Sequence, residues 1–133
     1  MPHDLIRMVK SRVARAAVGA SAVRGRGNKG TVEVARRFFR RVDLRRFATS
    51  NPEVFSAQLD RHTERLRRCL PNPRWGLARK AINLFLMDCF YNRYLSEAFG
   101  LCEAESLLEL PLDSFTGNQR LRWKTRRCRL GRE

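Results

Sequence analysis

The sequence predicts an all-α fold, a single domain of five or six helices. Apolar residues recur at three- and four-residue intervals through most of the chain, and no alternating strand pattern of useful length occurs. The length of 133 residues suits one domain, and a hydrophobic content of 43% is ordinary for a globular protein. One predicted helix, over about residues 74–99, is apolar around most of its circumference. We therefore expect it to lie at the centre of the domain.

The first predicted helix covers residues 4–18, where apolar side chains at helical spacing alternate with lysine and arginine. The basic segment "GRGNKG" at residues 25–30 interrupts the pattern, because its glycines favour turns over helix. A second helix, "VEVARRFFRR", is expected to follow with Thr31 as its cap.

Two interpretations fit the doublet Phe38–Phe39, which four arginines flank. The two rings could form a platform on which nucleic-acid bases stack. Alternatively, Val34 and Phe38, with Phe39 as a further candidate, face the core while the arginines face water. We favour the second interpretation, because this spacing is typical of an ordinary amphipathic helix.

A third helix is expected to begin at Pro52, with Ser50 and Glu53 at capping-box spacing. The segment "LPNPRWG" ends it with two prolines and a glycine, and the central helix follows. Gly100 suits the end of that central helix, and "CEAESLLEL" predicts one further short helix.

The formal net charge of +15 is concentrated at the two ends of the chain. Residues 1–50 carry 13 basic and 3 acidic side chains, residues 51–115 carry 8 and 9, and residues 116–133 carry 7 and 1. Arginine far outnumbers lysine, and its planar guanidinium suits phosphate geometry. Nucleic acid, DNA first, is therefore the expected partner, and an anionic membrane surface is second. A coding sequence rich in GC would explain part of the arginine excess.

No long apolar run and no signal-peptide pattern occur, so we expect a monomeric cytoplasmic protein, nucleoid-associated if it binds DNA. The cysteines form no CxxC motif, and His3 and His62 lie far from any cysteine pair. Free thiols in a reducing compartment are therefore predicted, with neither a metal site nor a cofactor. Residues 118–133 form a basic tail, expected to be a basic helix, a disordered arm or a non-native ending.

Lys80 enters the apolar stretch "RKAINLFLMDCF" near its start. A lysine amine is a nucleophile only when neutral, and an apolar environment favours that form. The alternative is that Lys80 lays its stem along the helix and places its ammonium group in water. Periodicity alone favours this alternative.

The segment "LPNPRWGLARKAINLFL" resembles the hairpin and following helix of the helix-hairpin-helix DNA glycosylases. The resemblance covers about residues 70–117, inside a helical domain of residues 1–117, and its spacing is closest to the archaeal 8-oxoguanine glycosylase branch. The apolar run and aspartate that follow in the family resemble "ELPLDSFTG" here, with Asp113 as the aspartate. The positions that match the hairpin and helix are Leu70, Pro71, Gly76, Arg79, Lys80, Asn83 and Leu86.

The resemblance implies base excision from DNA by a member of the family that is truncated after the aspartate. Lys80 would attack the sugar C1′ carbon, and Asp113 would either stabilise the positive charge that develops there or activate the nucleophile. A flipped base would need an aromatic pocket, for which Trp75, Phe85, Phe90 and Tyr91 are available. DNA would be held by Arg74 and Arg79 of the hairpin region and by Arg24, Arg26 and Lys29. The alternative function is a non-catalytic basic helical nucleic-acid-binding protein, or an inactive glycosylase fragment.

Overall fold

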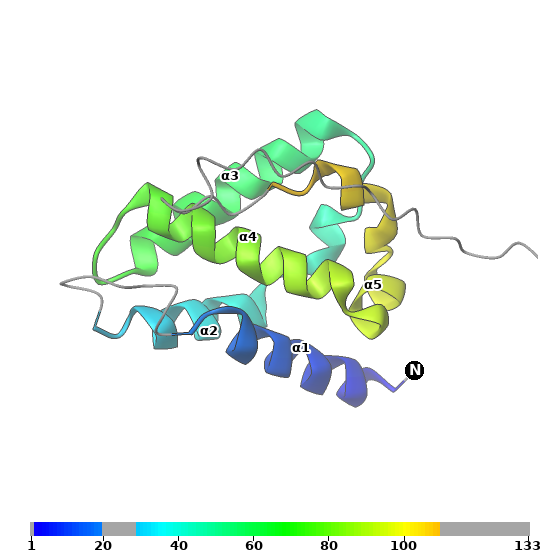
Figure 1. Ribbon diagram of the computed structural model, residues 1–133, viewed down its shortest axis with the longest axis horizontal. Coiled ribbons are helices and arrows are strands. Elements are labelled where there is room, and N and C mark those ends of the chain that lie inside the picture. The colour runs from blue at the N-terminus through cyan, green and yellow to red at the C-terminus, as the bar shows by residue number, and fades with distance from the viewer. Residues whose placement is uncertain (1, 20–28, 110–133) are drawn as a thin grey trace, which may run out of the picture.

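The computed structural model describes residues 2–19 and 29–109, which fold as a single all-α domain (Figure 1). This part of the chain contains α-helices and short 3₁₀ helices (η) and no strand, so the all-α prediction is confirmed. The elements in chain order are α1 (His3–Ala17), α2 (Thr31–Arg41), η2 (Leu44–Phe47), α3 (Pro52–Cys69), α4 (Trp75–Tyr91), α5 (Arg93–Phe99) and η3 (Leu101–Leu107).

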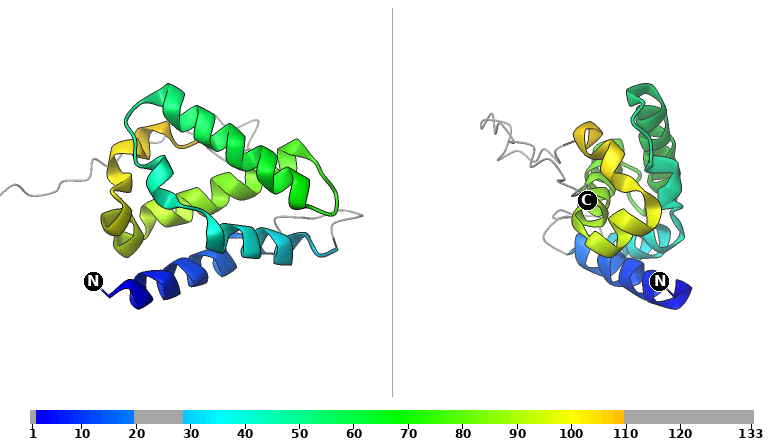
Figure 2. Two further views of the ribbon diagram at one scale, coloured as in Figure 1. Left: turned by 180° about the vertical axis from the view of Figure 1, so that it is seen from behind. Right: turned by 90° about the vertical axis from the view of Figure 1, so that its right-hand side faces the viewer.

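Helix α4 lies at the centre of the domain, as its composition predicts. It packs against α1, α2, α3 and α5. Figures 1 and 2 show it between α3 on one side and the pair α1 and α2 on the other. No helix of the described residues combines the length and apolarity needed to cross a membrane. The buried residues of α4 are Ala78, Ala81, Ile82, Asn83, Phe85, Leu86, Cys89 and Phe90.

The prediction of one continuous helix over residues 74–99 is wrong, because the chain turns at Asn92. This residue has extended backbone (φ −82°, ψ 114°), and its side-chain oxygen accepts a hydrogen bond from the N–H of Leu95 at 3.1 Å. Asn92 therefore caps the first turn of α5. The apolar pattern continues across the break, so periodicity does not reveal it. Gly100, in the left-handed region at φ 65°, ends α5 as expected.

The predicted start of α3 is confirmed at Pro52, but its cap is Asn51 rather than Ser50. The Asn51 side-chain oxygen accepts hydrogen bonds from the N–H groups of Glu53 at 2.9 Å and Val54 at 3.3 Å. A short amide side chain at this position satisfies two N–H groups that have no partner within the helix.

Helix α2 begins differently from the prediction, since Gly30 occupies the cap position and Thr31 is the first helical residue. Gly30 has φ 84°, a conformation that a side chain disfavours. Thr31 is buried, and its hydroxyl forms no hydrogen bond within the described residues. The threonine therefore contributes to the core rather than to the cap.

Lys10 of α1 reaches the C-terminal end of α2, where its ammonium group donates a hydrogen bond to the carbonyl of Val42. Val42 is the residue that ends α2, so a positive charge lies at the negative end of that helix. Burial lowers the pKa of Lys10, against the opposing effect of Cys89 and Asp43. This contact ties the first two helices together.

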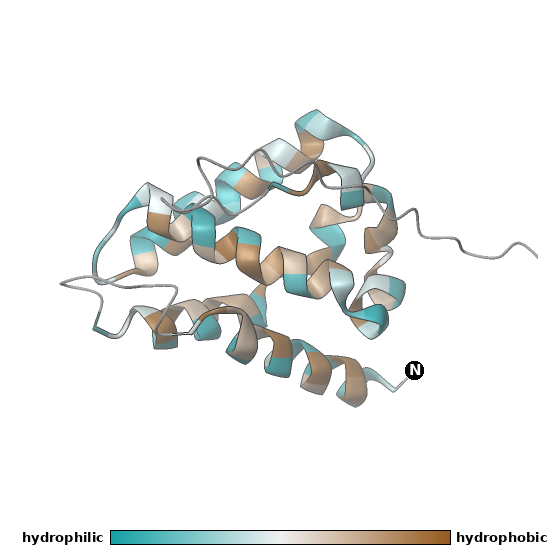
Figure 3. Ribbon diagram, viewed as in Figure 1, coloured by the Kyte–Doolittle hydropathy of each residue, from teal (hydrophilic) through white to brown (hydrophobic). Residues whose placement is uncertain are grey.

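Aromatic rings fill much of the core. Phe39 of α2 and Phe85 of α4 stack face to face, with centroids 4.4 Å apart. Phe55 of α3 makes edge contacts with Phe47 at 5.6 Å and Phe90 at 6.5 Å. Each of these contacts joins different elements of the fold. Figure 3 shows the hydropathy of the residues along each helix. Much of the visible face of α3 is hydrophilic, and hydrophobic segments lie along α1 and α4.

Candidate functional site

Lys80 lies in the first half of α4 and is partly buried. Asp113, its expected partner, lies outside the described residues, as do Arg24 and Arg26. The pairing of Lys80 with Asp113 therefore stays a prediction. Gly76, matched above to a hairpin glycine, is the second residue of α4, and a side chain added there would meet no atom of the described residues within 4 Å. The packing of this domain does not require a glycine at that position.

Arg79, predicted to bind DNA, is already neutralised by two carboxylates. Its Nε and Nη2 donate to the two oxygens of Glu109 at 2.9 and 2.8 Å, and Nη1 donates to Asp60 at 2.7 Å. The amide of Asn83 donates to the same Glu109 at 3.1 Å. We call these four residues the Arg79 cluster. They connect α3, α4 and the segment after η3, so Arg79 has a structural role here.

The protonation of this cluster follows from its hydrogen bonds. Partial burial disfavours the charge of Arg79, but the hydrogen bonds to Glu109 and Asp60 outweigh it and raise the pKa of Arg79. The hydrogen bond from Arg79 lowers the pKa of Glu109, with help from Asn83 and against the effect of burial. Arg79 and Glu109 are therefore both ionised at neutral pH.

The four aromatic residues predicted to line a base pocket do not share one. Phe85 and Phe90 are 1% and 7% exposed and belong to the core. Trp75 and Tyr91 are exposed but lie at the two ends of α4. They are sixteen positions apart, which is about 24 Å along a helix. The requirement for core packing explains the error, because apolar residues on all sides of a central helix are buried by its neighbours.

Arg74 and Lys29, the remaining described candidates for DNA contact, are both exposed. Arg74 occupies the cap position of α4, and Lys29 lies just before α2. No ion pair involving either of them is present among the described residues. They are therefore available to a ligand, but the structure offers a much denser cluster of positive charge elsewhere.

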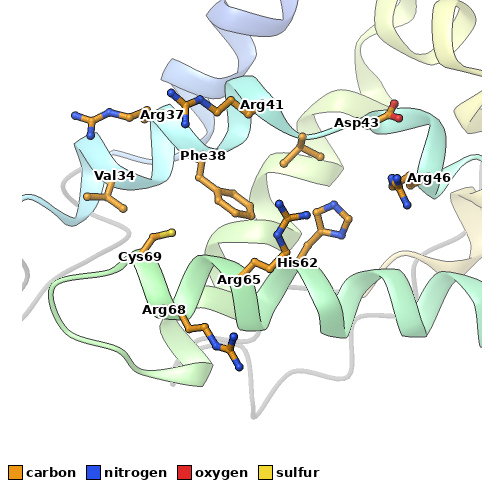
Figure 4. A pocket seen from close by; sticks show the side chains of 11 residues that line it. Val34, Arg37, Phe38, Arg41, Asp43, Arg46, His62, Arg65, Arg68 and Cys69 are labelled. Carbon is orange, nitrogen blue, oxygen red and sulfur yellow. The ribbon is translucent and has the colours of Figure 1, made fainter.

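A groove of about 840 Å³ opens between α2 and α3, with η2 near one end (Figure 4). Side chains from all three elements contribute to its walls. We call it the arginine groove, because five arginines line it, against one acidic residue, Asp43. These arginines are Arg37 and Arg41 from α2, Arg46 from η2, and Arg65 and Arg68 from α3.

Within the part of the chain that the structure describes, most of this positive charge is not compensated by carboxylates. Arg68 pairs with Glu64 at 3.1 Å, and the same carboxylate binds Arg67 at 2.5 Å. The hydrogen bond from Arg67 lowers the pKa of Glu64 to about 2. Among the described residues, no carboxylate forms an ion pair with the other four groove arginines, which are all exposed: Arg37, Arg41, Arg46 and Arg65. Four guanidinium groups are thus available to bind an anion.

The wall of the groove also contains an aromatic ring. Phe38 is partly buried and points from α2 toward α3 in Figure 4. Val34 and Val42 are the other apolar residues in this wall. The Phe38 ring makes a T-shaped contact with Phe39, with centroids 6.1 Å apart. Phe39 itself is fully buried. Phe39 thus belongs to the core, and Val34 and Phe38 pack against it, so the prediction that these residues face the core is confirmed. Phe38 also contributes to the wall of the groove, which the sequence did not indicate.

His62 of α3 completes the groove opposite Phe38. It is 4% exposed, and its Nδ1 donates to the carbonyl of Gln58 at 2.7 Å, which leaves Nε2 as an acceptor. Burial lowers the pKa of His62, and the nearby charges of Arg65, Arg46 and Arg61 act in the same direction. The hydrogen bond to Gln58 opposes both effects only in part, so the ring is neutral at neutral pH.

The described cysteines lie in three different environments. Cys69 is exposed at the edge of the groove, Cys102 is partly buried, and Cys89 is buried in the core. Burial raises the pKa of Cys89. Within residues 2–19 and 29–109, no cluster of three histidine, cysteine, aspartate or glutamate side chains could hold a metal ion.

Fold and site together define the chain as a small all-α domain with an arginine-lined groove between its second and third helices. Comparison with protein-family models, curated proteins and solved structures gives no match. The sequence contains a signal for the groove, since Arg37 and Arg41 are one helical turn apart, as are Arg65 and Arg68. Nothing in the sequence indicates that these two pairs face the same groove.

Proposed function

We propose that this protein binds nucleic acid and that the arginine groove holds the phosphates. The observation that carries the proposal is the set of four exposed groove arginines without a carboxylate partner among the described residues. Guanidinium groups bind phosphate through paired, charge-assisted hydrogen bonds, which makes arginine the preferred residue for this contact. The net charge of +15 adds long-range attraction for a polyanion.

A nucleic acid explains this surface better than an anionic membrane does. Helices that lie on membranes combine basic residues with an exposed apolar face that enters the lipid. The large exposed apolar residues of this domain do not line the groove: Met8, Val54, Trp75, Tyr91 and Tyr94. The unpaired arginines instead surround a hollow, which suits a phosphate chain.

The test compares two triple variants with the same change in net charge. Arg37→Gln, Arg41→Gln and Arg65→Gln remove charge from the groove, whereas Arg7→Gln, Arg12→Gln and Arg93→Gln remove exposed charge elsewhere. Binding of a labelled 20-nucleotide strand is followed by fluorescence anisotropy at several salt concentrations, and circular dichroism checks the fold. The wild-type slope of log affinity against log salt should fall by about 2 in the groove variant, since each phosphate contact on a single strand contributes roughly 0.7.

The control variant should keep most of the wild-type slope and affinity. Equal losses in the two triple variants would show that binding depends on net charge alone, and the groove would lose its assigned role. Arg74→Gln and Lys29→Gln, measured in the same way, report whether the hairpin region adds to the affinity.

Base excision is the second candidate function. It is supported by the resemblance to the DNA glycosylases and by the position of Lys80, partly buried on the central helix. Borohydride traps the Schiff base that a nucleophilic lysine forms with the C1′ of an excised site. A covalent adduct with lesion-containing DNA should form with the wild-type protein and not with Lys80→Ala. If both proteins fail to form it, the lyase proposal is refuted while nucleic-acid binding through the groove is unaffected.

A further inference from the structure

We infer that the arginine groove accepts an unpaired nucleotide, whose base stacks on Phe38, so that the ligand is single-stranded nucleic acid. This inference rests on the proposed function and specifies its ligand. Three features of the groove support it: an aromatic ring in its wall, a volume suited to a nucleotide, and arginines on opposite sides.

A site that binds phosphate alone does not need an aromatic ring in its wall. Phe38 is only partly buried and lies in a groove otherwise dominated by arginine. The T-shaped contact with the buried Phe39 at 6.1 Å fixes the ring before a ligand binds. Stacking on a ring that is already ordered loses little conformational entropy. Proteins that bind single strands combine such rings with a positively charged groove.

The dimensions of the groove favour an unpaired base. Its volume of about 840 Å³ falls in the range of small-molecule sites, roughly 300–1,000 Å³. The bases of a duplex are stacked inside it, and one of them could reach Phe38 only after unpairing and flipping, which costs a few kcal/mol. An unpaired strand can place a base against Phe38 without this step.

The arginines surround the aromatic ring on both sides. Arg37 and Arg41 lie one turn apart on α2, about 6 Å along the helix axis, and Arg65 lies on α3 across the groove. Figure 4 shows Phe38 between these two walls, with Arg65 and His62 on the opposite side. A strand that enters the groove can therefore contact arginine on either side of a stacked base.

The test measures three ligands against wild type and two phenylalanine variants at one salt concentration. The ligands are a 20-nucleotide single strand, the blunt duplex of the same sequence, and inorganic polyphosphate of similar charge. Phe38→Leu keeps an apolar side chain in the groove but removes the ring face, and Phe99→Leu is the control, because Phe99 lies on α5 outside the groove.

The single strand should bind wild type at least tenfold more tightly than the duplex. Phe38→Leu should weaken single-strand binding roughly 5- to 150-fold, the range expected for one lost base stack. Polyphosphate affinity should stay within twofold in both variants, because it has no base. Alkylation of the exposed Cys69 at the groove edge, followed by mass spectrometry of its peptide, should slow when the single strand is bound.

Three results would overturn the inference. They are a duplex affinity equal to that of the single strand, an unchanged single-strand affinity in Phe38→Leu, and an unchanged rate of Cys69 alkylation at saturating single strand. These outcomes differ from failure of the proposed function, in which the groove arginines would not contribute to the binding of any polyanion.

Discussion

Replacement of Arg79 by methionine should destabilise the domain without weakening nucleic-acid binding. Methionine retains an unbranched apolar stem but removes the guanidinium, which donates to Glu109 and Asp60 at 2.7–2.9 Å. The two carboxylates would lose the cation that neutralises them, and the contact between α4 and the segment after η3 would weaken. Arg79 does not line the arginine groove, so the proposed ligand does not touch it.

The expected loss follows from the exposure of the three charged side chains. The Arg79 side chain is 18% exposed, whereas those of Glu109 and Asp60 are 45% and 58% exposed. Hydrogen bonds between buried charged groups contribute about 1.5–3 kcal/mol, and exposed ion pairs contribute about 0.2–1 kcal/mol. The pair of hydrogen bonds between Arg79 and Glu109 should contribute an energy between these limits, about 1–2 kcal/mol. The ion pair between Arg79 and Asp60 should contribute less than about 1 kcal/mol. Arg79→Met should therefore lower the free energy of unfolding by about 2 kcal/mol.

A double-mutant cycle measures the coupling directly. Arg79→Met, Glu109→Gln and the double variant are unfolded in urea at pH 7, and the non-additive part of the free energies of unfolding is the interaction between the two residues. This coupling should shrink in acid. The pKa of Glu109 is lowered in the fold, so its contribution is complete above its unfolded pKa, near 4.3, and is lost as pH falls through the lower folded pKa.

Two outcomes would refute this reasoning. A coupling below about 0.3 kcal/mol, within the usual error of additivity, would mean that the observed geometry contributes nothing to stability. A loss of nucleic-acid affinity in Arg79→Met as large as that of the groove triple variant would return Arg79 to the DNA-binding role that the sequence suggested.

Three further predictions concern the core, the groove and a helix cap. Phe39→Ala removes a fully buried ring that stacks on Phe85, and urea unfolding should show a loss of about 3–5 kcal/mol; less than about 1 kcal/mol would contradict this packing. Because burial lowers the pKa of His62 in the fold, its neutral form supports stability above the unfolded pKa near 6.5. Stability is lost as pH falls below that value, and melts from pH 7.5 to 5 should show this fall in wild type but less of it in His62→Gln. Asn92→Ala removes the cap of α5 and should lower stability by about 1 kcal/mol, while Asn92→Asp keeps most of it; equal melting temperatures for both would disprove the capping role.

Much of the fold follows from patterns that act locally along the chain. The start of α3 at Pro52 and the end of α5 at Gly100 are where the sequence predicts them, because proline and glycine restrict or permit particular backbone angles. The central position of α4 also follows from its composition. The break at Asn92 was not predicted, because the apolar pattern continues on both sides of it. A single polar side chain, that of Asn92, forms the cap of α5.

The candidate site was predicted from the sequence much less well than the fold. Arg79 was predicted to bind DNA because of its positive charge. In the structure, Asp60 and Glu109, which are distant along the chain, neutralise that charge. Phe85 and Phe90 were assigned to a pocket, but neighbouring helices bury both. For Phe38, the direction of the ring depends on where α3 packs against α2, which no local pattern specifies.

The sequence by itself determined that this protein is helical, that α4 is its central element and that it carries a large positive charge. These properties depend on residue type and on spacing within one helix. Only the tertiary structure decided which arginines are compensated and which are available. Arg79 forms ion pairs with two carboxylates, whereas Arg37, Arg41 and Arg65 line one groove and form no ion pair within the described residues. The physical reason is that an ion pair or a shared groove depends on the distance between side chains from different helices, and packing sets that distance.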